Sequence, residues 1–309
     1  MQHIAFSRPG RFWRGNLHTH STRSDGALPP EEVCRRYEEA GYDFLCLSDH
    51  LIGRYGYPIT DTRDYRSNRF TTILGAEVHS GTLSNGEIWH ILAVGLPEDF
   101  ERPNQPDFTP HAEGESAGAL ARRCVEAGAY VAMAHPEWYA MTAADGATIG
   151  AAHAVEIYNH GCVVGAARGS GIGIWDALLN EGRRLTACAT DDAHFTEPDH
   201  FGGWVMVKAE ANEPDALVAA LREGAYYATT GPEIHDLRID GGVIHVTCSP
   251  AERVIALGAG AANEARHGKA MGRAEIPLTD RIAKGGWVRI VLDDAAGRRA
   301  WSNPIWLDD

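Results

Sequence analysis

Two histidines that could bind a metal ion, His18 and His20, are separated by one residue near the start of the chain, and Asp25 follows them. In an extended segment side chains alternate between faces, so His18 and His20 point the same way and can share one ion. Asp192 and His194 repeat this spacing late in the chain. Imidazole and carboxylate groups bind divalent cations, which activate water for hydrolysis.

Other candidate ligands stand at the ends of apolar runs. His50, Glu77 and His135 each follow directly on a short apolar run. Strands of a parallel barrel end at one rim, where barrel enzymes build their active sites. His90 instead precedes an apolar run, but Ser84-Asn85-Gly86 predicts a hairpin that brings His90 to the same end as Glu77. The predicted ligands are His18, His20, Asp25, His50, Glu77, His90, His135, Asp192 and His194.

Two further carboxylates neighbour these candidates in the sequence. Asp49 precedes His50, and we expect it to accept the second N–H of that histidine, because ligating histidines usually donate to such a group. Asp191 should point away from the face that Asp192 shares with His194, in a supporting role. Capping of local turns is the alternative role for both.

The elements that must position these residues follow from the pattern of apolar runs. From residue 12 to about 230, short apolar runs alternate with amphipathic segments, which favours an α/β domain with largely parallel strands. After residue 230 only short alternating runs remain, so we expect domains at residues 1–230 and 231–309, the second β-rich. Strands are expected at 44–48, 72–78, 130–134, 154–158, 185–189 and 204–207, then at 237–239, 243–248, 254–257 and 287–292. Helices are expected between residues 29 and 41 and at 116–127, 172–180 and 214–222.

In order and residue type, these motifs resemble those of the PHP (polymerase and histidinol phosphatase) superfamily of metal-dependent phosphoesterases. The resemblance covers residues 12 to 230 and implies a distorted (β/α)7 TIM-like barrel that holds three divalent cations, of Mn, Fe or Zn. The closing sequence at 303–307 and the trailing β-domain resemble a bacterial subgroup that includes carbaryl-esterase-type metallohydrolases. The matching motifs are His18-Thr19-His20 with Asp25, Asp49-His50, Glu77, His90, Ala134-His135-Pro136 and Asp192-Ala193-His194.

The resemblance also implies how the ligands divide among the cations. Glu77 would bridge a first and a second ion. The first ion would take His18, His20, Glu77 and Asp192. The second would take Glu77, His90 and His135, and the third Asp25, His50 and His194.

The charges of such a centre predict its chemistry. Three carboxylates against three divalent cations leave about three net positive charges, which attract an anionic phosphoryl group. Water that bridges the ions has a lowered pKa and supplies the nucleophile, so that Glu77, Asp192 and His194 act in catalysis by holding the ions. Arg168, His160 and His79, in that order, are candidates for binding the phosphate. Arg168 could equally cap a helix or pair with a surface acid.

The amino-acid composition limits the class of protein, its partners and its location. With 309 residues, 44% of them hydrophobic and 23% charged, the chain has an ordinary globular composition. A formal net charge of -14 disfavours a duplex nucleic acid partner. No apolar run approaches the roughly 20 residues that cross a bilayer, so we expect no membrane partner and a cytoplasmic location. The six scattered cysteines should be small buried hydrophobes.

Three functions are compatible with this sequence. The first is hydrolysis of a small phosphoester or nucleotide at a trinuclear metal site. The second is hydrolysis of a carboxyl or carbamate ester with the same ions. The third is a noncatalytic regulatory barrel that binds metal. The sequence leaves the oligomeric state open.

Overall fold

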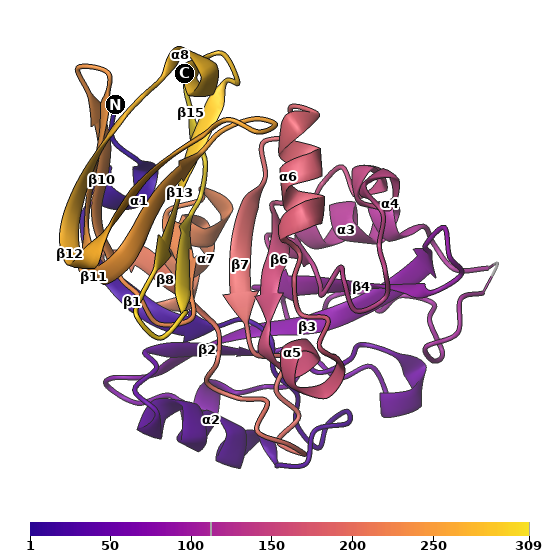
Figure 1. Ribbon diagram of the computed structural model, residues 1–309. Helices are drawn as coiled ribbons and strands as arrows, with labels where there is room; N and C mark the ends of the chain where they lie inside the picture. Colours follow the sequence, from indigo (N-terminus) through magenta and orange to yellow (C-terminus); the bar gives the residue numbers. More distant parts are fainter. Residues whose placement is uncertain (112, 309) are drawn as a thin grey trace.

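The structure is a computed structural model that describes residues 1–111 and 113–308. Asp309, the last residue of the expected second domain, lies outside the described residues. The described strands form one mixed sheet of 15 strands, with helices packed on the half nearer the N-terminus (Figure 1). The α/β class is therefore confirmed.

Seven strands follow one another in the sheet in the order of the sequence. They are β1 (Arg11–Asn16), β2 (Phe44–Leu47), β3 (Thr71–Thr82), β4 (Ile88–Val94), β5 (Tyr130–Met133), β6 (Ala154–Asn159) and β7 (Thr186–Thr190). Neighbours are parallel, except that β4 is antiparallel to both β3 and β5. This exception is the predicted hairpin. Every residue of β2, β4 and β5 is buried, as expected for strands covered on both faces.

Four helices coincide with the predicted segments, and α2 shows why. Pro30 occupies the first helical turn of α2 with two acidic residues, and Gly41 follows the helix with a φ of 81°, which glycine adopts readily. These helices are α2 (Pro30–Glu39), α3 (Ala117–Glu126), α6 (Ile172–Asn180) and α7 (Pro214–Arg222). The sequence did not predict α1 (Ile4–Ser7), α4 (Ala143–Thr148), α5 (His160–Ala166), α8 (Asp280–Ala283) or the 3-10 turns η1 (Gly53–Tyr55) and η2 (Arg63–Tyr65). These elements are too short for a clear helical period.

The chain segments that follow β1 and β7 meet each other at the carboxyl ends of the strands. Thr19 and Ala193 form a parallel bridge. The amide of Asp192 donates to the carbonyl of His18 at 2.8 Å, and the amide of His20 donates to the carbonyl of Ala193 at 2.9 Å. The segments after the first and last of the seven strands are therefore joined at this end, and we call β1 to β7 the seven-stranded ring.

At the amino ends of the strands the ring is joined differently. There β8 (Trp204–Ala209) pairs with β1, and β9 (Tyr226–Thr229) pairs with β8, both antiparallel. Between β7 and β9, the Asn303 side-chain oxygen accepts from the Ala187 amide at 2.9 Å, and its nitrogen donates to the Tyr226 carbonyl at 2.9 Å. The Tyr226 hydroxyl also donates to the Thr186 hydroxyl at 2.8 Å. We call Thr186, Ala187, Tyr226 and Asn303 the seam.

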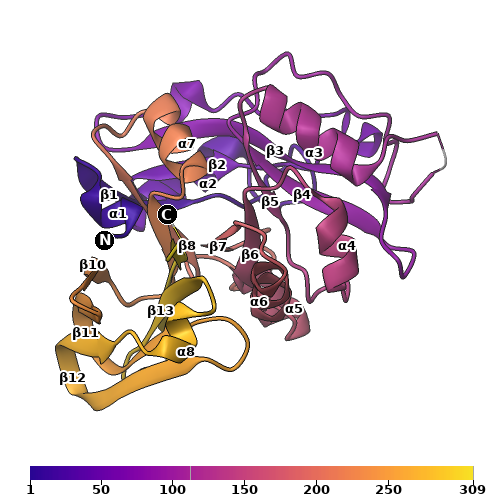
Figure 2. The ribbon, with the colours of Figure 1, turned by 90° about the horizontal axis from the view of Figure 1, so that it is seen from above.

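The C-terminal strands extend the same sheet beyond β9. Viewed from above, they lie beside the α/β part, and β8 stands between the two (Figure 2). They are β10 (Ile234–Asp240), β11 (Val243–Leu257), β12 (Asn263–Pro277), β13 (Trp287–Asp293), β14 (Arg299–Ser302) and β15 (Ile305–Trp306). The single strand β11 covers two predicted runs. The sequence did not predict β12, because most of its residues are exposed and carry little apolar alternation.

The domain boundary at residues 230 and 231 stays a prediction, and two features cross it. The sheet is continuous through β9 and β14. The N-terminal residues also join the C-terminal strands, because the His3 amide donates to the Leu237 carbonyl and the Ile239 amide donates to the Met1 carbonyl.

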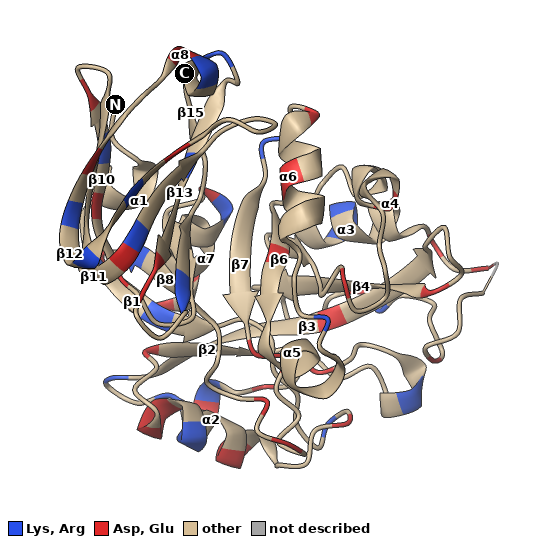
Figure 3. Cartoon of the chain, in the orientation of Figure 1, with Lys and Arg blue, Asp and Glu red and all other residues tan. Residues whose placement is uncertain are grey.

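Two expectations from composition concern the interior and the surface. All six cysteines are buried and unpaired, as predicted. Among the described helices, none has the length and apolarity needed to span a bilayer. Acidic and basic segments alternate along α2 and lie side by side on β11 and β12 (Figure 3).

Candidate metal centre

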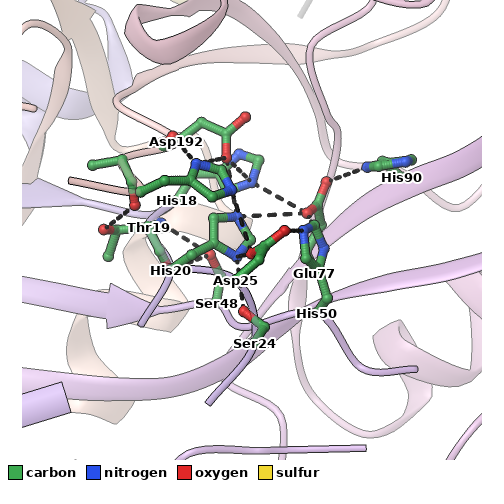
Figure 4. A network of polar contacts seen from close by, with 12 residues as sticks. His18, Thr19, His20, Ser24, Asp25, Ser48, His50, Glu77, His90 and Asp192 are labelled. Carbon is green, nitrogen blue, oxygen red and sulfur yellow. Dashed lines mark hydrogen bonds and ion pairs between the residues drawn. The ribbon is translucent and has the colours of Figure 1, made fainter. Parts of the chain in front are cut away.

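All nine predicted ligands lie at the carboxyl-end rim of the seven-stranded ring. The structure brings them together with His79 in overlapping groups, in each of which the candidate ligand atoms lie within 4.8 Å of one another. Figure 4 shows seven of the nine, labelled, around one centre. The groups are His20, Asp25, His50 and His194; His50, Glu77, His79 and His90; His18, Glu77 and His135; and His18, His20 and Asp192.

Local backbone pairing places these side chains. Parallel pairing of β2 with β3 continues beyond Leu47, because the Glu77 amide donates to the Ser48 carbonyl and His50 forms a bridge with Glu77. His135 and Asp192 have φ values of 24° and 54°, which are uncommon for residues with a side chain. Such backbone conformations cost of order 1–3 kcal/mol and concentrate at functional sites.

Glu77 is the central carboxylate of the cluster. It is fully buried, and its Oε1 lies 2.8 Å from His90 Nδ1 and 3.1 Å from His135 Nε2. Its Oε2 lies 2.7 Å from His50 Nδ1. Glu77 therefore contacts histidines from three different strand ends.

Asp25 occupies the outer part of the cluster. Its carboxylate lies 3.2 Å from His50 Nε2, 3.4 Å from His194 Nε2 and 3.8 Å from His20 Nδ1. One carboxylate thus faces three imidazoles. This is the composition expected of a site for a divalent cation.

Several buried atoms of the cluster have no hydrogen-bond partner among the described residues. His18 Nε2 lies 3.1 Å from Asp192 Oδ1 and 3.5 Å from Glu77 Oε2, yet it is not aligned for a hydrogen bond with either. His135 Nδ1 also makes no hydrogen bond, nor does Glu77 Oε2, although the latter lies 2.7 Å from His50 Nδ1. Buried polar atoms without partners are costly. Nitrogen and oxygen atoms that face a shared point fit a divalent cation between them, so the residues suit the metal ions that the sequence implies.

Electrostatics at the centre are set by burial and by opposed charges. Burial disfavours the charged form of Glu77, but the histidines around it hold its pKa well below the usual range. Burial likewise opposes protonation of His50, yet Glu77 and Asp25 outweigh it and raise its pKa to about 10. For His194 the balance of burial against Asp25 and Asp192 raises the pKa to about 9. Protons therefore compete with cations for these imidazoles.

The sequence analysis missed Glu156, a fully buried carboxylate in β6. It accepts hydrogen bonds from His18 Nδ1 at 2.9 Å, the His135 amide at 2.6 Å and Asn159 Nδ2 at 2.9 Å. Asn159 Nδ2 also lies 3.0 Å from Asp192 Oδ2. A signal existed, because Glu156 is the one acidic residue inside the predicted apolar strand at 154–158.

The predicted phosphate-binding residues are placed differently from the ligands. Arg168 is exposed beyond the end of α5, and His160 Nδ1 lies 3.0 Å from the Tyr158 hydroxyl and lines a separate groove beside β6. Neither is among the described residues that line the cavity at the cluster, and their role in phosphate binding stays a prediction. His79 is buried within the cluster, with its Nε2 2.9 Å from His50 Nδ1. No apolar run fixed the direction of the α5 segment, so the sequence could not place Arg168 or His160.

The two supporting carboxylates also differ from each other. Asp49 does not orient His50; it accepts from the Ser21 amide at 2.8 Å, the Ser24 hydroxyl at 2.7 Å and the Thr60 hydroxyl at 2.7 Å. It thereby holds the loop that carries Asp25. Asp191 points away from Asp192, as predicted, and accepts from the Tyr37 hydroxyl and from the amides of residues 201–203.

A cavity of about 460 Å³ opens onto the cluster. Its floor contains the candidate ligands, including Glu77, His135 and Asp192. Phe108 and Trp138 form apolar walls. No Lys or Arg is among the described residues that line it. The arrangement can hold cations beside a small, partly apolar substrate.

Known proteins resemble this chain in fold but not detectably in sequence. No protein-family model matches the chain, and no curated protein matches it in sequence. A solved two-domain protein from Bacteroides vulgatus, containing a predicted PHP-like metal-dependent phosphoesterase, matches with a TM-score of 0.53 and 15% identity over 95% of both chains. The chain shares the overall fold of that protein. The resemblance seen in the sequence is thus confirmed at the level of the fold.

Two other structures match this chain over less of its length. An amidohydrolase from Chromobacterium violaceum, solved with bound sulfate and no metal, has a TM-score of 0.46 and 16% identity over 60% of this chain and 89% of its own. A Bifidobacterium adolescentis protein, provisionally assigned as a metal-dependent phosphoesterase, has a TM-score of 0.44 and 12% identity over the same shares. Of these three structures, the Bacteroides vulgatus protein is similar enough to establish a shared fold.

Proposed function

We propose that the protein is a metal-dependent hydrolase that cleaves a small phosphoester. The observation that carries this proposal is the convergence of nine titratable side chains, from distant parts of the sequence, around one cavity. We further propose that the seven-stranded ring is a distorted (β/α)7 barrel. Its joined carboxyl end and the shared fold with the Bacteroides vulgatus protein support that architecture.

The geometry supports a division of the ligands among three cations of Mn, Fe or Zn. Asp25 with His50 and His194 would hold the outer cation. Glu77 reaches histidines on both sides and would link the other two. His18, His20 and Asp192 would complete the first of these, and His90 and His135 the second.

Hydrolysis needs an activated water and an ordered substrate. Divalent cations, when bound, lower the pKa of water so that it attacks at neutral pH. The chain's residues fix the geometry: Glu156 orients His18, and Asn159 holds the Asp192 carboxylate. Phe108 and Trp138 exclude water from one side of the cavity.

The test combines elemental analysis with release of phosphate from 4-nitrophenyl phosphate. We expect about three metal ions per chain and chelator-sensitive activity. Asp192→Asn should lose metal and activity, whereas Asp215→Asn, at an exposed acid of α7, should keep both. Full activity of chelator-stripped protein would refute the proposal.

A second candidate is hydrolysis of a neutral carboxyl or carbamate ester. The observation that favours it is the lack of Lys and Arg among the described lining residues, because a phosphate site often includes one. Rapid turnover of 1-naphthyl acetate or carbamate with negligible phosphatase activity would establish it. The third possibility, a regulatory metal-binding barrel, requires a fully metal-loaded protein that hydrolyses none of these substrates.

A further inference from the structure

The outer part of the cavity has two aromatic walls. The Trp138 ring lies 5.1 Å from the His135 ring and is 42% exposed. The Phe108 ring lies 4.8 Å from the His50 ring. Both aromatic side chains therefore stand directly above candidate metal ligands, where the part of a substrate that leaves would lie.

Two carboxylates line the same cavity on its solvent side. Glu87, just before β4, and Glu197, in the loop after β7, are both exposed. Neither side-chain carboxylate makes an ion pair or a hydrogen bond with any described residue. The cavity thus has an inner part suited to cations and an outer part with uncompensated negative charge.

We propose that the natural substrate is zwitterionic: a phosphoester whose leaving group is aromatic and carries an amine. The phosphoryl group would face the metal centre, the ring would lie between Phe108 and Trp138, and the ammonium would face Glu87 and Glu197. Aromatic faces and carboxylates both attract ammonium groups. A nucleotide polyphosphate, by contrast, would bring further negative charge close to these two carboxylates. This inference rests on the proposed function.

The reaction is a simple hydrolysis. Water forms the new P–O bond, the bond between phosphorus and the phenolic oxygen breaks, and the phenol leaves with a proton from the water. No other reactant is required.

Three aryl phosphates of matched shape test the charge preference: 4-(2-aminoethyl)phenyl phosphate, 4-ethylphenyl phosphate and 4-(2-carboxyethyl)phenyl phosphate. We expect kcat/KM to fall about fivefold from the amine to the ethyl compound and about fivefold again to the carboxylate, as for weakly screened exposed ion pairs. Equal or faster hydrolysis of the carboxylate would overturn the inference.

Variants test whether Glu87 and Glu197, which we call the cavity mouth, cause this charge preference, or whether the overall charge of the protein does. The double variant Glu87→Gln with Glu197→Gln should hydrolyse all three compounds at similar rates. Glu126→Gln, which removes an exposed charge at the end of α3, should keep the preference. Trp138→Ala should slow all three alike. A preference that survives in the double variant would contradict the assignment of Glu87 and Glu197.

Binding distinguishes failure of the inference from failure of the proposed function. If the metal-loaded protein hydrolyses none of the three phosphates, the proposed function is wrong. Calorimetric titration of the metal-loaded protein with 4-(2-aminoethyl)phenol and with 3-(4-hydroxyphenyl)propionate still tests the mouth. Tighter binding of the amine, lost in the double variant, would support the inference, and equal or weaker binding would overturn it.

Discussion

The two ends of the seven-stranded ring are joined by opposite kinds of chemistry. At the carboxyl end, buried histidines and carboxylates crowd together, and several of their polar atoms have no hydrogen-bond partner among the described residues. At the amino end, the seam joins the strands by neutral hydrogen bonds from Asn303 and Tyr226. The carboxyl end therefore carries groups that are costly without a ligand, while the amino end supplies stability; barrel enzymes show the same division.

The largest loss of activity and metal is expected for Glu77→Gln, at the carboxyl end of the ring. Glu77 contacts histidines from three strand ends, so its loss should lower phosphatase activity by more than the roughly 100-fold typical of residues that only orient ligands. Metal content by mass spectrometry should fall in parallel. Retention of the full metal complement would break the assignment of Glu77 as the central carboxylate.

A smaller loss is expected for Glu156→Gln. Glu156 accepts from His18 Nδ1, and a neutral amide would hold that imidazole less firmly. Metal affinity, measured by competition with a coloured chelator, should weaken about 10- to 100-fold. Glu126→Gln serves as the control and should not change affinity. An unchanged affinity for Glu156→Gln would reduce this residue to a packing role.

Substitution in the seam should lower stability without lowering metal content. Asn303→Ala removes hydrogen bonds to Ala187 and Tyr226, so the free energy of unfolding should fall by about 1–3 kcal/mol while metal content stays unchanged. Denaturant titration measures the first quantity and elemental analysis the second. Asn180→Ala, which removes one exposed hydrogen bond to Gly260, should cost less. Loss of metal in Asn303→Ala would show that the two ends are not separable.

Metal binding should also depend on pH. The pKa of His50 is raised to about 10 and that of His194 to about 9, so both imidazoles are protonated near pH 7 in the metal-free protein. Binding needs their neutral forms, so affinity should rise with pH until about 9 to 10. These raised pKa values stabilise the metal-free protein below the unfolded value near 6.5, and that contribution disappears as the pH rises through about 9 to 10.

Calorimetry in two buffers with different heats of ionisation counts the protons released on metal binding. At pH 7, metal binding to the metal-free protein should release protons from the imidazoles at the carboxyl end. Addition of zinc to protein already saturated with metal should release none. Binding without proton release would contradict the charge balance assigned to His50 and His194.

The sequence could predict most of the candidate ligands because they stand at a recognisable strand end or in a hairpin, whereas His18 and His20 were indicated by their same-face spacing. It could not predict the role of Glu156, since which histidine a buried carboxylate meets depends on the packing of distant strands. The seam was hidden for the same reason, because Asn303 lies 116 residues from Ala187. Arg168 and His160 lie outside the cavity lining because the turn of a short helix, rather than an apolar run, sets their direction.

The position of Asn303 in the chain affects the order in which the protein can be completed. The ribosome makes every strand of the ring before this residue, so the strands around the seam must wait for a side chain that arrives later. We expect a nascent chain halted before residue 303 to be cut readily by protease near β7, and one that has emerged past it to resist. Final closure of the ring would then depend on how quickly the C-terminal strands are translated.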